Sequence, residues 1–415
     1  MKMHRINATE CSRLGAAALL LSCAVAAAQA PGPVLRVNTY ATGDQQAPAI
    51  ASDGAGNYLV VWQSDGEDGS LAGIYAQRYA ANGTRLGGEF RVNSYTTNMQ
   101  ILPAVAMNAA GAFVIVWDSV GQNGNGLGVY GQRYAANGAP LGGEFKLNTS
   151  TNDMSTQIGI AIDASGNFAV AWPEHFTPLG VSTAKTSLID LRLYGADGSA
   201  RGNPITIATS LTDNLRVPAV AMNSSNIVVT WNAAGRGHLL AGPAGLGVGI
   251  RAQRLKADGT QQGLTIDVNA VSASVVVDRP VVALDAGSNF VIAWETLGTD
   301  LSPHGVHARR YAANGSAIAA EFAVGDVSKL QRNPAIAMGA AGNFAIAAHS
   351  DGIYLQTYGA NAAPMMSTRV DDSSLGNSGA LSPALAFDAA GNIVLAWQDY
   401  GRDGDGRGIA VRAYR

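Results

Sequence analysis

The sequence carries little charge. Asp, Glu, Lys and Arg make up 14% of the 415 residues, whereas an average soluble domain is about a quarter charged. The 27 basic and 30 acidic residues nearly cancel, giving a formal net charge of −3, so there is no basic excess with which to bind nucleic acid. Hydrophobic residues reach 47%, too many for a disordered chain. The composition therefore predicts a folded protein that does not bind nucleic acid.

Long apolar runs are also scarce, and the one that exists lies at the N-terminus. Lys2 and Arg5 form a basic start, 14–25 is an apolar run, and small residues follow it. The run is shorter than the about 20 residues that a transmembrane helix needs, and this order of features is typical of a secretory leader. We predict that residues 1–28 are a signal peptide cleaved after Ala28, so that the protein is secreted or periplasmic and has no transmembrane segment.

Cysteine is nearly absent. Cys11 and Cys23 are the only two in the chain, and both lie in the predicted leader. The mature chain 29–415 would then have no disulfide, no cysteine nucleophile and no Cys-ligated zinc site. One alternative gives Cys23 a role, because Leu20 to Cys23 is similar to a lipobox, which would make the protein a lipid-anchored structural component of the envelope.

What the sequence has in abundance is one repeated unit. Pro48-Ala-Ile-Ala-Ser-Asp53 begins the first copy and recurs in altered form six more times, followed each time by a short turn and an apolar run. The run ends in Trp in six copies, whereas the sixth copy has Ala348 in that place. We place the seven units at about 48–95, 103–150, 158–210, 218–272, 280–327, 334–372 and 383–415.

Each unit predicts four strands, because Asp-Gly and Asn-Gly turn signals separate runs of strand-forming residues. In the first unit these strands are 48–53, 57–64, 73–80 and 88–95. The second strand is apolar on both sides, so it must be covered on both faces, as it is when sheets stack face to face. Seven such units predict an all-β fold, a seven-bladed β-propeller in which 29–415 form a single domain.

The two ends of the chain predict how the ring closes. The last unit stops after its third strand at Arg415, whereas 34–40 matches a fourth strand that has no unit of its own. Pairing of these two ends would complete the seventh blade and remove an exposed sheet edge. We also expect the recurring Trp to pack between neighbouring blades.

The unit P-A-x-A-x-[DN]-x-x-G-N-F-x-V-x-W, followed by G-I-Y-x-Q-R-Y and G-E-F-x-V-N, resembles a repeat of secreted and surface proteins of bacteria, often those with RTX-type or adhesin-like modules. It resembles more loosely the FG-GAP repeats of integrin-type propellers. The resemblance covers nearly all of 29–415 and implies an extracellular binding or adhesion role, in some members with calcium. It brings no catalytic residue, and the D-x-D-x-D-G loop of FG-GAP repeats is not reproduced cleanly.

Acidic, glycine-rich loops between the second and third strands are the candidate metal sites. Ca²⁺ takes about six to eight oxygen ligands on a backbone that turns sharply, and such loops occur in units 1 and 7, which ring closure makes neighbours. The candidate ligands are Asp65, Asp68, Asp399, Asp403 and Asp405. Asp-Gly is also an ordinary turn sequence, so solvated turns are the alternative. No other cofactor is predicted.

No catalytic motif stands out. The sequence has neither G-x-S-x-G nor H-E-x-x-H, and it singles out no pair of carboxylates for glycoside cleavage. The favoured hypothesis is a non-catalytic binding or adhesion module whose variable-loop face takes a glycan or a protein. The alternative is an extracellular polysaccharide-active enzyme, either a lyase or a glycoside hydrolase, which convergent carboxylates or arginines on that face would favour.

Overall fold

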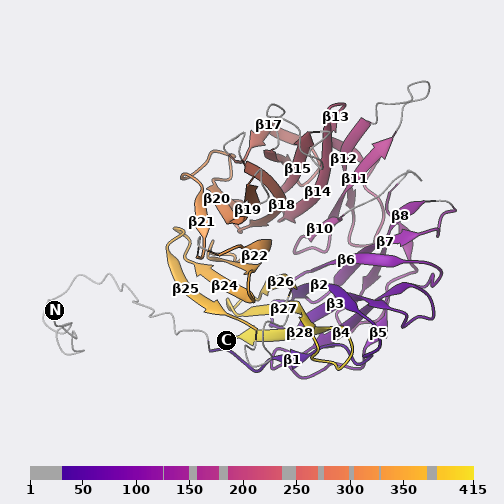
Figure 1. The fold of residues 1–415 in the computed structure, drawn as a ribbon. Helices are drawn as coiled ribbons and strands as arrows, with labels where there is room; N and C mark the ends of the chain where they lie inside the picture. The colour runs from indigo at the N-terminus through magenta and orange to yellow at the C-terminus, as the bar shows by residue number, and fades with distance from the viewer. Residues whose placement is uncertain are drawn as a thin grey trace, which may run out of the picture.

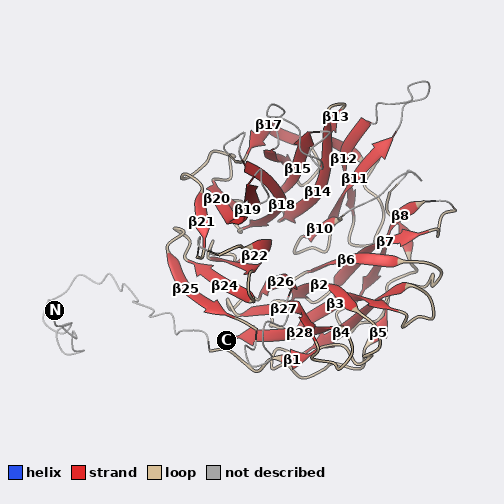
Figure 2. Cartoon of the chain, in the orientation of Figure 1, coloured by secondary structure: helices blue, strands red, loops and turns tan. Residues whose placement is uncertain are grey.

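The protein is a ring of seven four-stranded antiparallel sheets (Figures 1 and 2). The computed structural model describes residues 30–124, 126–148, 157–176, 186–235, 249–269, 275–298, 303–326, 329–371 and 381–415. All the elements in these ranges are strands, which confirms the predicted seven-bladed β-propeller. The described part has no helix long and apolar enough to cross a membrane. The predicted signal peptide 1–28, with Cys23, lies outside the described residues.

The strands follow one another outward from the axis in each blade, and the bounds of the first four blades are as follows. Blade 1 comprises β2 (Gln45–Ser52), β3 (Tyr58–Asp65), β4 (Ala72–Tyr79) and β5 (Phe90–Arg91). Blade 2 comprises β6 (Gln100–Met107), β7 (Phe113–Val120), β8 (Leu127–Tyr134) and β9 (Phe145–Lys146). Blade 3 comprises β10 (Gly159–Ile162), β11 (Phe168–Phe176), β12 (Thr186–Tyr194) and β13 (Ile205–Ser210). Blade 4 comprises β14 (Asp213–Met222), β15 (Asn226–Gly235), β16 (Gly249–Lys256) and β17 (Gln261–Asp267).

The other three blades repeat this order, and the last one takes its outer strand from the N-terminal end. Blade 5 comprises β18 (Val275–Leu284), β19 (Phe290–Gly298), β20 (Pro303–Tyr311) and β21 (Phe322–Val324). Blade 6 comprises β22 (Arg332–Met338), β23 (Phe344–His349), β24 (Ile353–Tyr358) and β25 (Pro364–Arg369). Blade 7 comprises β26 (Leu381–Phe387), β27 (Ile393–Tyr400), β28 (Arg407–Tyr414) and β1 (Leu35–Arg36).

Pairing of β1 with β28 closes the ring, as the chain ends predict. Leu35 lies opposite Val411 in this antiparallel pair, and the backbone N–H of Val37 donates to the carbonyl of Ile409 at 2.8 Å. This pairing joins the first strand of the chain to the last one, which removes the sheet edge that an open array would expose.

The outer strand of blade 1 is much shorter than predicted. The sequence indicates a strand over 88–95, yet only Phe90–Arg91 pairs as β5. The ladder ends early because the side chain of Asn93 replaces the backbone: its Oδ1 accepts a hydrogen bond from the N–H of Ile74 at 2.7 Å. At Asn93 a side-chain oxygen, rather than a backbone carbonyl, thus satisfies the N–H group of the neighbouring strand.

The core lies between blades, and the tryptophans fill it. All six are at most 1% exposed. Trp62 of blade 1, for example, packs with Val394 and Ala396 of blade 7 in one cluster of buried side chains. The second strands are therefore covered on both faces, as their composition predicts, and low charge follows because few positions on such strands face water.

Candidate functional site

The first strand of each blade lies nearest the axis of the ring, where successive first strands contact one another (Figure 1). Six of the seven carry a β-bulge beside the repeated proline; in β2 the register skips from Gln46 to Ala49. The residue before the proline has a φ between 49° and 53°, and these residues are Ala47, Leu102, Val217, Arg279, Asn333 and Ser382. Residues other than glycine rarely adopt this conformation. Six blades adopt this strained conformation, and the bulge fixes the direction in which the neighbouring side chains point.

Charged side chains gather at these bulges on one side of the axis only. Blades 1, 2 and 7 have uncharged residues in the two positions before the proline, whereas blades 4, 5 and 6 have a charged residue two positions before it, and blade 5 also has Arg279 directly before it. Arg216 Nη2 lies 3.3 Å from Asp278 Oδ2. Arg279 Nε and Arg332 Nε lie 3.9 and 3.7 Å from the two carboxylate oxygens of Glu295. Three arginines from three blades thus converge on two carboxyl groups of blade 5.

Glu295 is the buried member of this cluster, with a side chain only 5% exposed. Burial raises the pKa of its carboxyl group above the usual value, and the N–H of Asn333 together with Arg279 and Arg332 opposes the shift without cancelling it. That N–H donates to Glu295 Oε2 at 3.2 Å. The strained bulge of blade 6 therefore holds one oxygen of the carboxyl group.

A neutral amide can perform the same structural task. Gln63, the residue after the tryptophan in blade 1, corresponds to Glu295 in blade 5. Its Oε1 accepts a hydrogen bond from the N–H of Leu102, at the bulge of blade 2, at 3.2 Å. The hydrogen bond between one blade and the bulge of the next therefore needs an acceptor atom but no charged group. The ionisable group of Glu295 exceeds what the fold requires, which marks the position as a candidate site residue.

Asp278 and Glu295 lie directly opposite each other on β18 and β19. Directly opposed residues of antiparallel strands have Cβ atoms about 4.5–5.5 Å apart. Asp278 Oδ2 ion-pairs with Arg216, whereas its Oδ1 is buried and has no hydrogen-bond partner among the described residues. The two carboxyl groups thus differ in burial: Asp278 pairs with one arginine and its side chain is 24% exposed, whereas Glu295 lies near two arginines, is 5% exposed and has a raised pKa.

His349 borders the cluster on blade 6, where it lies opposite Arg332 in the β22–β23 pair. Burial lowers the pKa of its imidazole, and Arg332 lowers it further. The ring is therefore neutral at physiological pH and can donate or accept a hydrogen bond beside the arginines.

The five predicted calcium ligands lie at the ends of β3 and β27 and in the loops that follow these strands, and four of them, Asp68, Asp399, Asp403 and Asp405, accept hydrogen bonds from protein groups. Asp68 Oδ1 accepts from the N–H of Ser70 at 3.1 Å, and Asp399 Oδ2 accepts from Arg402 Nε at 2.6 Å. Asp403 Oδ2 accepts from Asn38 at 2.9 Å. In the described residues no group of three or more His, Cys, Asp or Glu is arranged to hold a metal ion.

Ring closure places the loop of blade 7 against the segment that precedes blade 1. Asp405 Oδ2 accepts a hydrogen bond from the N–H of Gly43, which precedes blade 1, at 3.2 Å. Burial and the neighbouring Asp44 raise the pKa of Asp65. Calcium binding by these loops stays a prediction. A melting temperature that EDTA does not change would contradict it, because an ion bound only to the native state raises stability.

Reasoning from the sequence missed the arginine cluster, although a signal was present. Alignment of the units on the repeated proline shows that the second residue before it is charged in three consecutive units, as Arg216, Asp278 and Arg332. Comparing that position between units, rather than reading only the recurring motif, would have singled it out.

No family model and no curated protein matches the chain. Its structure is similar to that of a protein of unknown function from Dyadobacter fermentans, with a TM-score of 0.54 and 10% identity over 92% of this chain and 97% of the other. It is also similar to an alpha-L-arabinanase of Penicillium chrysogenum complexed with arabinobiose, with a TM-score of 0.51 and 12% identity over 75% and 92% of the two chains. These likenesses show the propeller fold alone, and the resemblance to RTX-type, adhesin-like and FG-GAP repeats stays a prediction.

Proposed function

We propose that the protein cleaves a glycan at the mouth of its axis, with Asp278 and Glu295 as the two reacting carboxyl groups. The observation that carries the proposal is that the two residues lie directly opposite each other on β18 and β19 and differ in burial. Retaining glycoside hydrolases use two carboxyl groups about 5–5.5 Å apart, one as acid and the other as nucleophile. The structurally similar arabinanase, which was complexed with arabinobiose, makes a sugar substrate a natural first test.

The surroundings of each carboxyl group assign its role. The raised pKa of Glu295 keeps its proton available, so it donates that proton to the glycosidic oxygen as the bond to the anomeric carbon breaks. Asp278, ion-paired with Arg216, supplies the carboxylate that bonds to the anomeric carbon. Glu295 then takes a proton from a water molecule as the water oxygen bonds to the anomeric carbon and the bond to Asp278 breaks, which releases the sugar and restores both carboxyl groups.

The arginines set the substrate class. Arg216, Arg279 and Arg332 outnumber the two carboxyl groups, so the cluster stays net positive whichever form Glu295 takes. Arg279 is 53% exposed, so its guanidinium group can reach a ligand. Guanidinium groups bind carboxylates and sulfates through paired hydrogen bonds. We therefore propose an acidic polysaccharide, one that bears uronate or sulfate groups, as the substrate.

Release of reducing ends from acidic polysaccharides by the purified protein tests the proposal. Glu295→Gln should lower turnover by about 10²–10⁴-fold, as loss of a general acid does, and leave the fold intact because Gln63 performs the structural task in blade 1. Asp278→Asn should be at least as damaging. The matched control is Asp267→Asn, which alters an exposed carboxylate on the outer strand of blade 4. Wild-type protein that releases no reducing ends from any acidic polymer would contradict the proposal.

Binding without cleavage is the second candidate, and the exposed guanidinium of Arg279 supports it. This is the favoured hypothesis from the sequence, narrowed to an acidic glycan. A wild-type protein and a Glu295→Gln variant that bind the polymer equally, with no turnover by either, would establish it in place of the enzyme. Both candidates share the proposal that the leader exports the protein, and recovery of a chain that starts at Gln29 from outside the cytoplasm tests that.

A further inference from the structure

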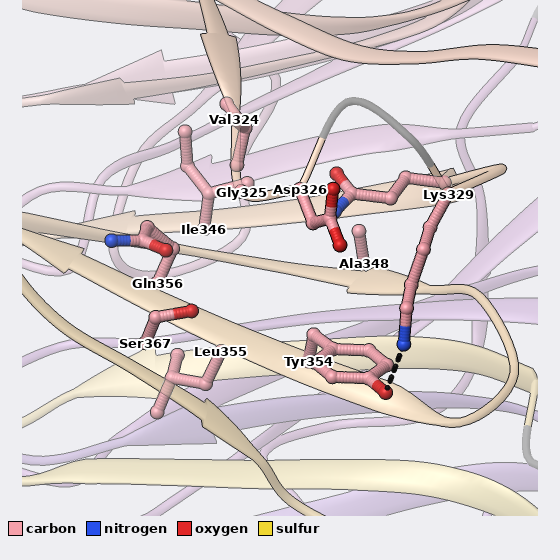
Figure 3. A pocket seen from close by; sticks show the side chains of 11 residues that line it. Val324, Gly325, Asp326, Lys329, Ile346, Ala348, Tyr354, Leu355, Gln356 and Ser367 are labelled. Carbon is pink, nitrogen blue, oxygen red and sulfur yellow. Dashed lines mark hydrogen bonds between the residues drawn. The ribbon is translucent and has the colours of Figure 1, made fainter.

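A cavity of about 240 Å³ lies between blades 5 and 6 (Figure 3). Val324 of β21, Ile346 and Ala348 of β23 and Leu355 of β24 line it with apolar side chains, and Asp326, Gln356 and Ser367 add polar groups to its wall. Lys329 and Tyr354 stand together on one side of it, and the lysine Nζ donates to the tyrosine hydroxyl at 3.1 Å. The cavity is separate from the carboxyl groups of the proposed reaction, although Gln331 in its wall directly precedes Arg332.

The repeat explains why the cavity exists. At the other six junctions, an aliphatic side chain of one outer strand shares a cluster with the tryptophan of the next blade, as Leu147 does with Trp172. At the junction of blades 5 and 6 the corresponding pair is Val324 and Ala348. The indole ring that fills each of the other junctions is missing here, and the cavity lies where that ring would be.

A second departure from the repeat keeps this space open without leaving polar groups unpaired. Four blades place an asparagine after the outer-strand aliphatic residue, whereas blade 5 has Gly325. A Cβ atom at Gly325 would lie 2.6 Å from the side-chain amide of Gln331, so a larger residue would displace Gln331. With its nitrogen turned towards Val324, this amide donates to the carbonyl of Val324 at 2.6 Å and accepts from the N–H of Asp326 at 3.3 Å. Gln331 is therefore held against β21, out of the volume next to Ala348.

Lys329 supplies a positive charge to a wall that also includes the carboxyl group of Asp326. Its ammonium group lies 5.0 Å from the centroid of the Tyr354 ring and 3.2 Å from Asp351 Oδ2, and both charged side chains of that pair are more than a third exposed. Exposed ion pairs of this kind are weak, so a ligand carboxylate can displace Asp351 at low cost. The ring of Tyr354 offers a flat surface next to the charge.

We propose that this cavity binds a flat aromatic carboxylate, with its ring in the volume that tryptophan fills at the other junctions and its carboxylate on Lys329. Apolar protein cavities of about 150 Å³ bind benzene, and pockets for drug-sized molecules begin at about 300 Å³. At about 240 Å³ the cavity suits a ligand of one or two fused rings.

Calorimetric titration of the full chain with indole-3-acetate, indole and tryptamine tests this proposal. We expect indole-3-acetate to bind more tightly than indole, and tryptamine, which carries a positive charge, to bind most weakly. Lys329→Met should weaken binding of indole-3-acetate about tenfold, as loss of one charged hydrogen bond does, and leave binding of indole unchanged. Wild-type protein that binds none of the three compounds, or that binds tryptamine as tightly as indole-3-acetate, would overturn the proposal.

Filling the cavity is the decisive variant. Ala348→Trp should abolish binding of all three compounds and raise the melting temperature, and Ala348→Met provides a smaller change if the tryptophan variant does not fold. Binding that persists unchanged in a folded Ala348→Met and Ala348→Trp would place the ligand elsewhere. Glu295→Gln should not alter affinity for indole-3-acetate, so this control separates failure of the cavity proposal from failure of the proposed enzyme.

Discussion

The junction between blades 1 and 2 and the junction between blades 5 and 6 are built from the same repeat but are filled differently. At the first, Trp117 is fully buried, and Asn93 accepts from the N–H of Ile74 at 2.7 Å and donates to Gln100 at 3.1 Å. At the second, Ala348 and Gly325 occupy the corresponding positions, and a cavity remains.

The comparison teaches where to look for function in a repeat protein. Residues that recur in most blades, such as the tryptophans, hold blades together, so their loss is expected to reduce stability. Residues that depart from the repeat gather in blades 4 to 6, both in the cavity and in the arginine cluster at the axis. Changes there are expected to affect ligands more than folding.

The largest effect is expected from Trp117→Ala, which would open at the first junction the cavity that the second already has. Loss of a buried tryptophan side chain removes about 3–5 kcal/mol of the free energy of unfolding, measurable by urea denaturation. The matched control, Ala348→Trp at the second junction, should add stability. A Trp117→Ala variant that loses less than about 1 kcal/mol would break the comparison between the two junctions.

Asn93→Ala should have the next largest effect. It leaves the buried N–H of Ile74 without its acceptor and removes the bond to Gln100, which costs about 1–3 kcal/mol. The free energy of unfolding from chemical denaturation measures this. Arg91→Ala, which alters an exposed residue of the same outer strand, is the control and should change little. Equal losses for the two variants would show that the asparagine does not hold the junction.

A smaller, pH-dependent effect is expected at Glu67, for which blade 2 provides the reference. There, the amide of Gln122 donates to Glu144, whereas blade 1 places Glu67 beside Glu89. Burial, together with Glu89, raises the pKa of Glu67 to about 8. The pKa in the folded state thus exceeds the unfolded value of 4.5, so the stability that this group contributes is complete below that value and is lost as pH rises through about 8.

Glu67→Gln should therefore remove this pH dependence and stabilise the protein above pH 8 by about 1 kcal/mol, an amount discounted because the carboxyl group is partly solvated. Melting temperatures recorded across this pH range measure the effect. Gln122→Glu is the reciprocal control and should create the same dependence in blade 2. If the stability of the wild type relative to Glu67→Gln rises as the pH passes through 8, the prediction is wrong.

The smallest effect on stability is expected from Arg279→Ala. More than half of this side chain is exposed, so the free energy of unfolding should change by no more than about 0.5 kcal/mol. Affinity for an acidic polysaccharide should fall about tenfold with the loss of a charged hydrogen bond. If neither the affinity for the polysaccharide nor the free energy of unfolding changes, Arg279 is not part of the proposed site.

The repeat alone was enough to predict the architecture. Seven copies of one unit, a strand such as Tyr58–Asp65 that is apolar on both sides, and an unmatched segment at each end allow few arrangements other than a closed ring. The outer strand of blade 1 was predicted too long because the sequence does not show where a side chain such as Asn93 replaces the backbone.

The site could not be predicted in the same way. Arg216, Asp278 and Arg332 are separated by more than fifty residues along the chain, and only the ring places them at one point on the axis. Glu295 follows a core tryptophan, and nothing local distinguishes it from Gln63 of blade 1. Its raised pKa arises from burial in the folded ring, which is a tertiary property.

The sequence by itself determined the blade: its turns, its two-faced central strand, its tryptophan and the number of copies, because these depend on residues close together in the chain. The tertiary structure decided what the scarce charges do. Most positions on stacked sheets exclude charge, so the few charged residues are left to the axis, the loops and the outer strands. Closing the ring is what sets three arginines against two carboxyl groups and leaves one junction open.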